Sequence, residues 1–153
     1  EIIIIGTAYK EKDFEKLDLI IKKFKKLGKK VILTSQTPNF YYVNARTLID
    51  HFYIKNERLP NEIELIEIEK QKFNSIDNSI KEINKKVMKV AIKNKLKVLD
   101  KKDLLCQNEL KRCFVLSNEE DKIHEDGEHI TISGANFVGK RIFDLNWLDL
   151  NHD

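Results

Sequence analysis

EIIIIG at residues 1–6 and KVILTS at residues 30–35 are two short β-branched runs, each followed by turn-forming residues. Continuous runs of this kind are typical of strands that are buried on both faces of a parallel sheet. Between them, apolar residues recur at spacings of three and four, and Gly28 then provides a stop signal. The apolar positions are Phe14, Leu17, Ile20, Ile21, Phe24 and Leu27. The pattern predicts a right-handed βαβ unit with a helix over residues 13–27 and a parallel sheet.

The remainder of the chain continues the alternation of strands and helices. We predict a loop with a short helix over 40–58, a helix over 76–95 and a strand over 97–100. The segment 61–70 suits either an edge strand or the start of a helix, and its many Glu residues favour the helix. A long loop over 101–128 contains both cysteines, and Thr131 or Ser133 caps a last helix that turns Phe137, Val138, Ile142 and Phe143 inward. The expected fold class is α/β, a three-layer α/β/α sandwich with a parallel sheet. Active sites in such sheets lie at the carboxyl ends of the strands.

Length and charge narrow the possible functions. The chain has 153 residues and 18.0 kDa, which suits a single domain over 1–153. Its 28 Lys and Arg are interspersed with 25 Asp and Glu, which argues against nucleic acid as a partner. The longest aliphatic run, Ile2–Ile5, is far shorter than the roughly 20 residues that cross a bilayer, so this segment contains no membrane anchor. Because residue 1 is Glu and lies directly in a predicted strand, we expect further sequence upstream.

The sharpest chemical pattern is DGEH at residues 126–129. An Asp three residues before a His, across a turn that contains Gly, can fold its carboxylate onto the Nδ1–H of the imidazole. This contact would fix the tautomer of His129 and leave Nε2 as a general base. The alternative is a solvated polar loop that caps the last helix, which is the commoner role of an arbitrary D-x-x-H tetrapeptide.

The stretch from Leu99 to Ile142 resembles the SGNH (GDSL-like) hydrolase domain that is fused to bacterial membrane acyltransferases. The features that match in order are two cysteines, a D-x-x-H-[LI]-[ST] motif and a Gly-Ala pair at the start of the last helix: Cys106, Cys113, Asp126, His129, Ile130, Thr131, Gly134 and Ala135. GKKVILTSQTPNF at 28–40 is similar to the Gly-Lys-x-Val strand of the family. The resemblance spans nearly the whole chain, although only its last third is specific.

This resemblance implies a function in the cell envelope. A Ser-His-Asp mechanism would transfer O-acetyl groups to an envelope glycan such as lipopolysaccharide, with Asp126 and His129 as catalytic residues. A membrane acyltransferase domain would deliver the acyl donor, and the domain would lie on the periplasmic or extracellular face of the membrane. We expect a monomer without a cofactor or metal. A carbohydrate esterase of the same family and a non-catalytic flavodoxin-like binding module are the alternatives.

The nucleophile departs from the family pattern. The family's Gly-Asp-Ser motif is absent, and none of the five serines (Ser35, Ser75, Ser79, Ser117 and Ser133) follows a Gly-x or Gly-Asp pair. GTAY at residues 6–9 stands where the family often has a tryptophan-containing segment or a Gly-x-Asn oxyanion donor. We therefore expect the nucleophile block upstream of residue 1, although an inactive copy would show the same departures. Ser35, at the end of a strand, is the only serine in a plausible catalytic position, and we favour a bond from its hydroxyl to the turn before Pro38.

The cysteines and the aromatic residues leave alternatives open. Cys106 and Cys113 could be free thiols, or could bind a metal together with His124, Asp126 or His129. HEDGEH at 124–129 is one residue too long for an H-E-x-x-H site and contains Gly. The resemblance places the loop outside the cytosol and thereby implies a disulfide between the two cysteines.

A group of aromatic residues could line a groove for an acceptor sugar, although core and lid packing is commoner; its members are Phe40, Tyr41, Tyr42, Phe52 and Tyr53.

Overall fold

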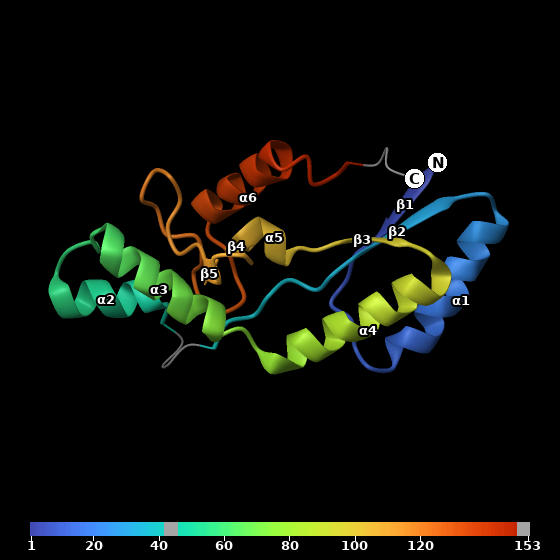
Figure 1. Ribbon diagram of the computed structural model, residues 1–153, viewed down its shortest axis with the longest axis horizontal. Helices are drawn as coiled ribbons and strands as arrows, with labels where there is room; N and C mark the ends of the chain where they lie inside the picture. The colour runs from blue at the N-terminus through green and yellow to red at the C-terminus, as the bar shows by residue number, and fades with distance from the viewer. Residues whose placement is uncertain (42–45, 150–153) are drawn as a thin grey trace. The chain divides into compact units, whose positions relative to one another are not determined.

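The computed structural model describes residues 1–41 and 46–149, and Figure 1 follows the chain through them. The chain forms two compact units, each described here by itself. Unit 1 comprises Glu1–Thr37 and Asn78–Lys102, and unit 2 comprises Pro38–Asp77 and Asp103–Asp153. The expectation of one SGNH-like domain over residues 1–153 stays a prediction.

Unit 1 contains the predicted parallel sheet. Its strands are β1 (Ile2–Ile5), β2 (Lys30–Thr34) and β3 (Lys97–Leu99), in the order β1-β2-β3. Both pairings are parallel, with Ile3 opposite Val31 and Leu33 opposite Val98. Helix α1 (Asp13–Lys26) connects β1 to β2, and α4 (Asn78–Asn94) precedes β3. The α/β class, the parallel sheet and the strand-helix-strand unit are therefore confirmed.

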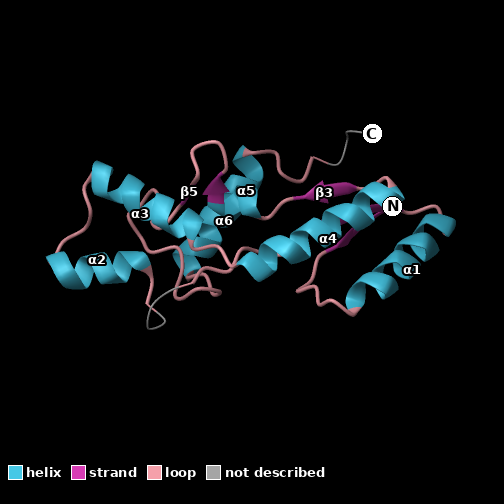
Figure 2. Ribbon diagram, turned by 60° about the horizontal axis from the view of Figure 1, so that its bottom comes forward, coloured by secondary structure: helices cyan, strands magenta, loops and turns pink. Residues whose placement is uncertain are grey.

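Helices α1 and α4 share one core with the sheet (Figure 2). The buried side chains of this core are Tyr9, Leu17, Ile21, Val31, Leu33, Val87 and Ala91. The expectation that the first strand is buried on both faces is wrong. Side chains alternate along a strand, so Ile5 packs against this core while Ile2 and Ile4 point to the opposite face and stay 37% and 44% exposed.

Unit 2 is mostly helical. It contains α2 (Leu48–Asn56), α3 (Glu62–Asn74) and α6 (Ile132–Asp144), and α5 (Lys102–Leu105) begins at the end of unit 1. Reciprocal capping boxes start two of these helices, Thr47 with Asp50 in α2 and Asn61 with Glu64 in α3. The ambiguous segment 61–70 is thus a helix. The predicted loop over 101–128 contains α5 and a short antiparallel pair, β4 (Cys106–Gln107) and β5 (Arg112–Cys113).

The last helix begins as predicted but faces its core differently. Thr131 is the cap, since its Oγ1 accepts the Gly134 N–H at 2.9 Å. Phe137 and Val138 pack against a core made of Phe40, Ile76, Leu105, Cys106, Cys113 and Ile123. Phe143, by contrast, is 85% exposed, so its predicted inward orientation is wrong. The inward stripe of 134, 137, 138 and 141 ends with Arg141, whose guanidinium donates to the carbonyl oxygens of Asp103 and Leu104.

Candidate active site

A looped segment between residues 123 and 131 carries the predicted Asp and His. At its base, the Thr131 N–H donates to the Ile123 carbonyl at 2.9 Å, and His124 pairs with Ile130 in an antiparallel bridge. The Glu125 N–H then donates to the His129 carbonyl at 2.9 Å. These backbone bonds leave residues 126–128 as a tight turn, which brings the side chains at its two ends together.

Asp126 and His129 are in direct contact. The Nδ1 of His129 lies 2.8 Å from Oδ2 of Asp126. The other carboxylate oxygen, Oδ1, accepts the backbone N–H groups of Glu128 and His129 at 2.8 and 2.7 Å. Three donors therefore hold one carboxylate, and the predicted contact between the two residues is present. Its catalytic role stays a prediction.

These contacts shift both ionisation equilibria. The backbone N–H of His129, followed by that of Glu128 and by the imidazole, lowers the pKa of Asp126 below its ordinary 3.8. The hydrogen bond to Asp126 raises the pKa of His129 above its ordinary 6.5. A carboxylate that stays ionised can stabilise an imidazolium, and a raised pKa strengthens the imidazole as a base. With 75% of its side chain exposed, the imidazole is accessible to a substrate.

A pocket of about 310 Å³ adjoins this turn. Its wall comes from 126–129 and from a second segment that the sequence analysis did not assign to the site, Asn39, Phe40, Tyr41 and Asp77. Phe40 N–H donates to the Gly127 carbonyl at 2.9 Å, and the Asn39 side chain donates to Glu128 at 3.1 Å. The QTPN turn signal at 36–39 marked the end of a strand, but nothing in it indicated contact with residues almost 90 positions away.

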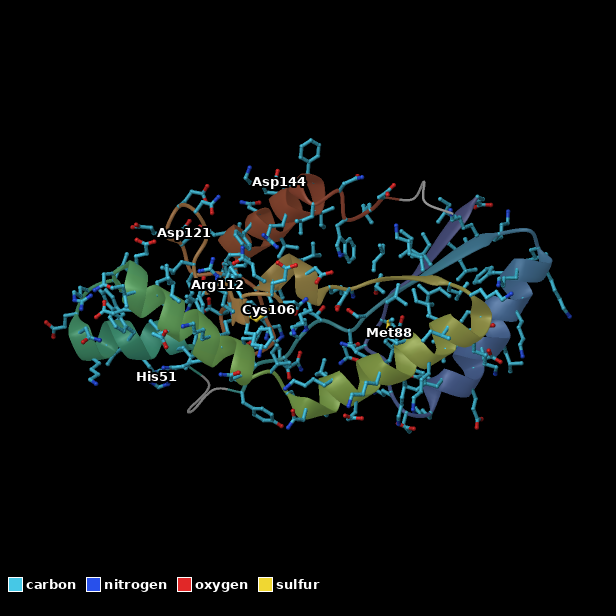
Figure 3. The ribbon with its side chains drawn as sticks, viewed as in Figure 1. His51, Met88, Cys106, Arg112, Asp121 and Asp144 are labelled. Carbon is cyan, nitrogen blue, oxygen red and sulfur yellow. A yellow bond between two sulfur atoms is a disulfide. The ribbon has the colours of Figure 1, made fainter. Side chains whose placement is uncertain are left out.

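The two cysteines form a disulfide. Cys106 and Cys113 face each other across the β4–β5 pair, and both are buried (Figure 3 labels Cys106 and Arg112 of this pair). The disulfide implied by the resemblance is present, whereas free thiols and a metal-bound thiolate are not. Closing a loop of this length stabilises the folded chain by about 2.5 kcal/mol through the entropy of the unfolded state. His124, one of the three further candidate ligands, lies against Lys72, with Nδ1 2.8 Å from the amine.

Ser35 has a structural role, with a different partner from the one predicted. Its buried hydroxyl donates to Asp100 Oδ1 at 2.7 Å and accepts the Lys101 N–H at 2.8 Å. It therefore ties the end of β2 to the end of β3 rather than to the turn before Pro38. The side chain that contacts the His129 imidazole is that of Asp126.

The aromatic group divides between core and surface. Phe40 is buried, and Phe52 packs against a small core between α2 and α3. Tyr41 and Tyr53 are 70% and 55% exposed, and Tyr42 lies outside the described residues. Tyr41 lines the pocket next to His129. Among the described members of the group, Tyr41 is exposed and available to a ligand at this site, while the buried Phe40 also contributes to the wall of the pocket.

A comparison with protein families identifies the family of this chain. The family model described as SGNH domain (fused to AT3 domains) matches residues 3–144. This chain belongs to the SGNH domain family. The matched range includes the parallel sheet, the Cys106–Cys113 disulfide and the Asp126–His129 turn. No curated protein matches the chain.

Two solved structures are similar to this chain, and the first of them shares its fold. The periplasmic domain of a lipopolysaccharide acetyltransferase from Salmonella ser. Paratyphi A is 17% identical, with a TM-score of 0.63 over 95% of this chain and 56% of that one. A GDSL-like lipase from Bacteroides thetaiotaomicron is 20% identical, with a TM-score of 0.47 over 96% of this chain and 60% of that one. The SGNH chain described here therefore spans less than two thirds of either structure. Among the described residues, no helix has the length and apolar character to cross a membrane.

Proposed function

We propose that this SGNH chain supplies the general base of an O-acyltransferase, with His129 as the base and Asp126 as the residue that orients it. The observation that carries the proposal is the Nδ1–Oδ2 contact of 2.8 Å, which leaves Nε2 of an exposed imidazole directed to other partners. Membership of a family fused to AT3 domains supports acyl transfer as the reaction. The transferred group is an acetyl group, and the acceptor is a hydroxyl of a cell-envelope glycan.

The reaction proceeds through an acylated serine that lies outside residues 1–153. Nε2 of His129 takes the proton of the serine hydroxyl, and the serine oxygen attacks the acyl carbonyl of the donor. Collapse of the tetrahedral intermediate breaks the bond to the donor's leaving group, which receives the proton from His129. In the second half, His129 takes the proton of the acceptor hydroxyl, whose oxygen attacks the acyl-serine ester. The proton then returns to the serine oxygen, and the ester of the glycan is released.

The partners and location follow from the same proposal. A membrane acyltransferase domain delivers the acyl donor, and the chain acts as a monomer on the periplasmic or extracellular face of the membrane. The pocket beside His129 suits a sugar that carries no negative charge, because Asp77, Asp126 and Glu128 line it together with the Tyr41 ring. Water could take the place of the acceptor, since the imidazole is 75% exposed, and the chain would then act as an esterase.

Substitutions at the chromosomal locus of the source organism test the proposal. His129→Ala removes the base, and Asp126→Asn removes the charge that supports it; each is expected to abolish or sharply reduce O-acetylation. The measurement is acetate released by mild alkali from the isolated envelope glycan, with protein levels matched by immunoblot. His51→Ala, in α2 and outside the pocket, is the control histidine. Unchanged acetate in the His129→Ala strain would refute the assignment and favour a non-catalytic binding module.

A further inference from the structure

Lys72 of α3 is a buried lysine that contacts residues next to the Asp126–His129 turn. Only 1% of the residue is exposed, and burial lowers the pKa of its amine to about 7. Burying an amine is costly unless its hydrogen-bonding capacity is satisfied. The Nζ atom donates to the Phe114 carbonyl at 2.6 Å, lies 2.8 Å from Nδ1 of His124, and sits 4.7 Å from the centre of the Phe40 ring. A protonated amine has three N–H groups, and this surrounding offers an acceptor to each.

Each of the three acceptors belongs to a segment that shapes the Asp126–His129 turn. His124 lies two residues before Asp126 and pairs with Ile130 on the far side of the turn. Phe40 donates its N–H to the Gly127 carbonyl, inside the turn itself. Phe114 precedes Val115, whose carbonyl accepts the N–H of Ile123 at the base of the turn. One amine thus ties together the base, the side and the tip of this loop.

The His124 ring is the link between the lysine and the turn. It is 2% exposed, and burial, followed by the neighbouring Lys72 charge, lowers its pKa to about 3, so the ring is neutral. When the Lys72 amine is protonated it can only donate, so Nδ1 accepts and the ring proton lies on Nε2. The ring also packs edge-to-face on Phe40, with centroids 5.1 Å apart. Its rotamer is therefore held from two sides.

The other charged groups around the amine do not replace these contacts. Glu69, one turn earlier in α3, is the acidic neighbour that raises the pKa of Lys72. Its buried carboxylate accepts the Val115 N–H, and Arg112 lies 3.9 Å from it. Glu69 therefore holds the segment next to Phe114, while the amine of Lys72 makes the contact with His124.

We infer that Lys72 is a positioning residue for the Asp126–His129 pair, acting through His124, Phe40 and Phe114. This inference rests on the proposed function, in which His129 is the base. Lys72 contacts neither reacting group. It holds the loop in the conformation that keeps the carboxylate of Asp126 against the His129 imidazole.

The pKa of His129, followed by NMR titration of the imidazole Cε1–H signals in the purified protein, tests this inference. In Lys72→Met, which has no donor, we expect the pKa of His129 to fall toward the value measured in Asp126→Asn. Lys70→Met, an exposed lysine of the same helix, is the matched control and should leave the pKa of His129 unchanged. A Lys72→Met protein that retains the wild-type His129 pKa would overturn the inference. If wild type and Asp126→Asn give the same His129 pKa, the pair itself fails, and the proposed function fails with it.

A second measurement needs no variant and therefore does not depend on whether Lys72→Met folds. A long-range ¹H–¹⁵N correlation spectrum of the wild-type protein reports the tautomer of each histidine. We expect neutral His124 with its proton on Nε2 and an acceptor at Nδ1. The spectrum is recorded well below pH 7, where the Lys72 amine is protonated and can only donate. A proton on Nδ1 under these conditions would exclude the bond from Lys72 and overturn the inference.

Discussion

Replacing Gly134 with alanine is expected to destabilise the protein, although alanine normally favours a helix. A Cβ atom at this position would lie 2.1 Å from the Ile123 carbonyl oxygen and 2.9 Å from its carbon. Unbonded carbon atoms normally stay roughly 3.5 Å or more apart, so α6 and residue 123 must separate by an ångström or more. Residue 123 cannot move freely, because its N–H donates to Val115 and its carbonyl accepts from Thr131.

The magnitude follows from a comparison with Gly139 in the same helix. A Cβ at Gly139 meets nothing within 4 Å, so Gly139→Ala should stabilise by about 1 kcal/mol through helix propensity. Gly134→Ala gains at most the same stability from helix propensity, and overpacking lowers its free energy of unfolding by about 1–3 kcal/mol or more. The propensity gain is common to both variants, so they should differ by the overpacking cost, about 1–3 kcal/mol or more in the free energy of unfolding.

Urea unfolding followed by far-UV circular dichroism measures this difference directly. The His129 pKa is a useful second readout, because the shift at Ile123 would reach the turn through the bond to Thr131. If Gly134→Ala is as stable as Gly139→Ala, α6 does not approach residue 123 as closely as described. The contact between α6 and Ile123 would then not hold the Asp126–His129 turn.

Two further outcomes are expected. Asp126→Asn should lower the free energy of unfolding most between pH 3.8 and 6.5. The stabilisation from the raised pKa of His129 is complete below pH 6.5 and is lost as pH rises through the folded-state pKa, while the stabilisation from the lowered pKa of Asp126 is complete above pH 3.8 and is lost as pH falls. A loss of stability that does not depend on pH, in urea titrations from pH 3 to 9, would contradict these shifts. Ser35→Ala should lower the free energy of unfolding by about 1–3 kcal/mol, because it leaves Asp100 and the Lys101 N–H short of a partner. Glycan O-acetylation in that strain should persist at matched protein level, and its loss would identify Ser35 as the nucleophile.

The features that could be predicted are those that short stretches of sequence specify. The runs at 1–6 and 30–35 and the spacing of apolar residues between them were enough to predict the βαβ unit. The intervening helix ends at Lys26, and Gly28 follows its cap with a φ of +69°, which suits glycine. The contact between Asp126 and His129 was predictable for the same reason. They lie three positions apart, so a local turn brings the two side chains together.

The features that could not be predicted depend on contacts between distant residues. Lys72 occurs in a helix rich in Glu and Lys, where a lysine is normally solvated, and its partner His124 is 52 positions away. The prediction that Phe143 is buried was wrong for a related reason. Its apolar character suggested burial, but the side chain of α6 that faces inward at this level is Arg141, whose guanidinium donates to the carbonyl oxygens of residues 103 and 104.

The local motif and the distant contacts have different roles in the proposed chemistry. The D-x-x-H turn brings the two groups within hydrogen-bond distance, but a turn whose imidazole is 75% exposed gains little rigidity from its own packing. Rigidity comes from the buried side of the same loop, where Lys72, Phe40 and the close approach of Gly134 fix its base. A base must be held in one orientation to accept a proton efficiently, so substitutions on the buried side should reduce transfer while the Asp and His remain in place. In the proposed acyl transfer, a turn held in this way can expose its base to a large glycan without losing the orientation of the imidazole.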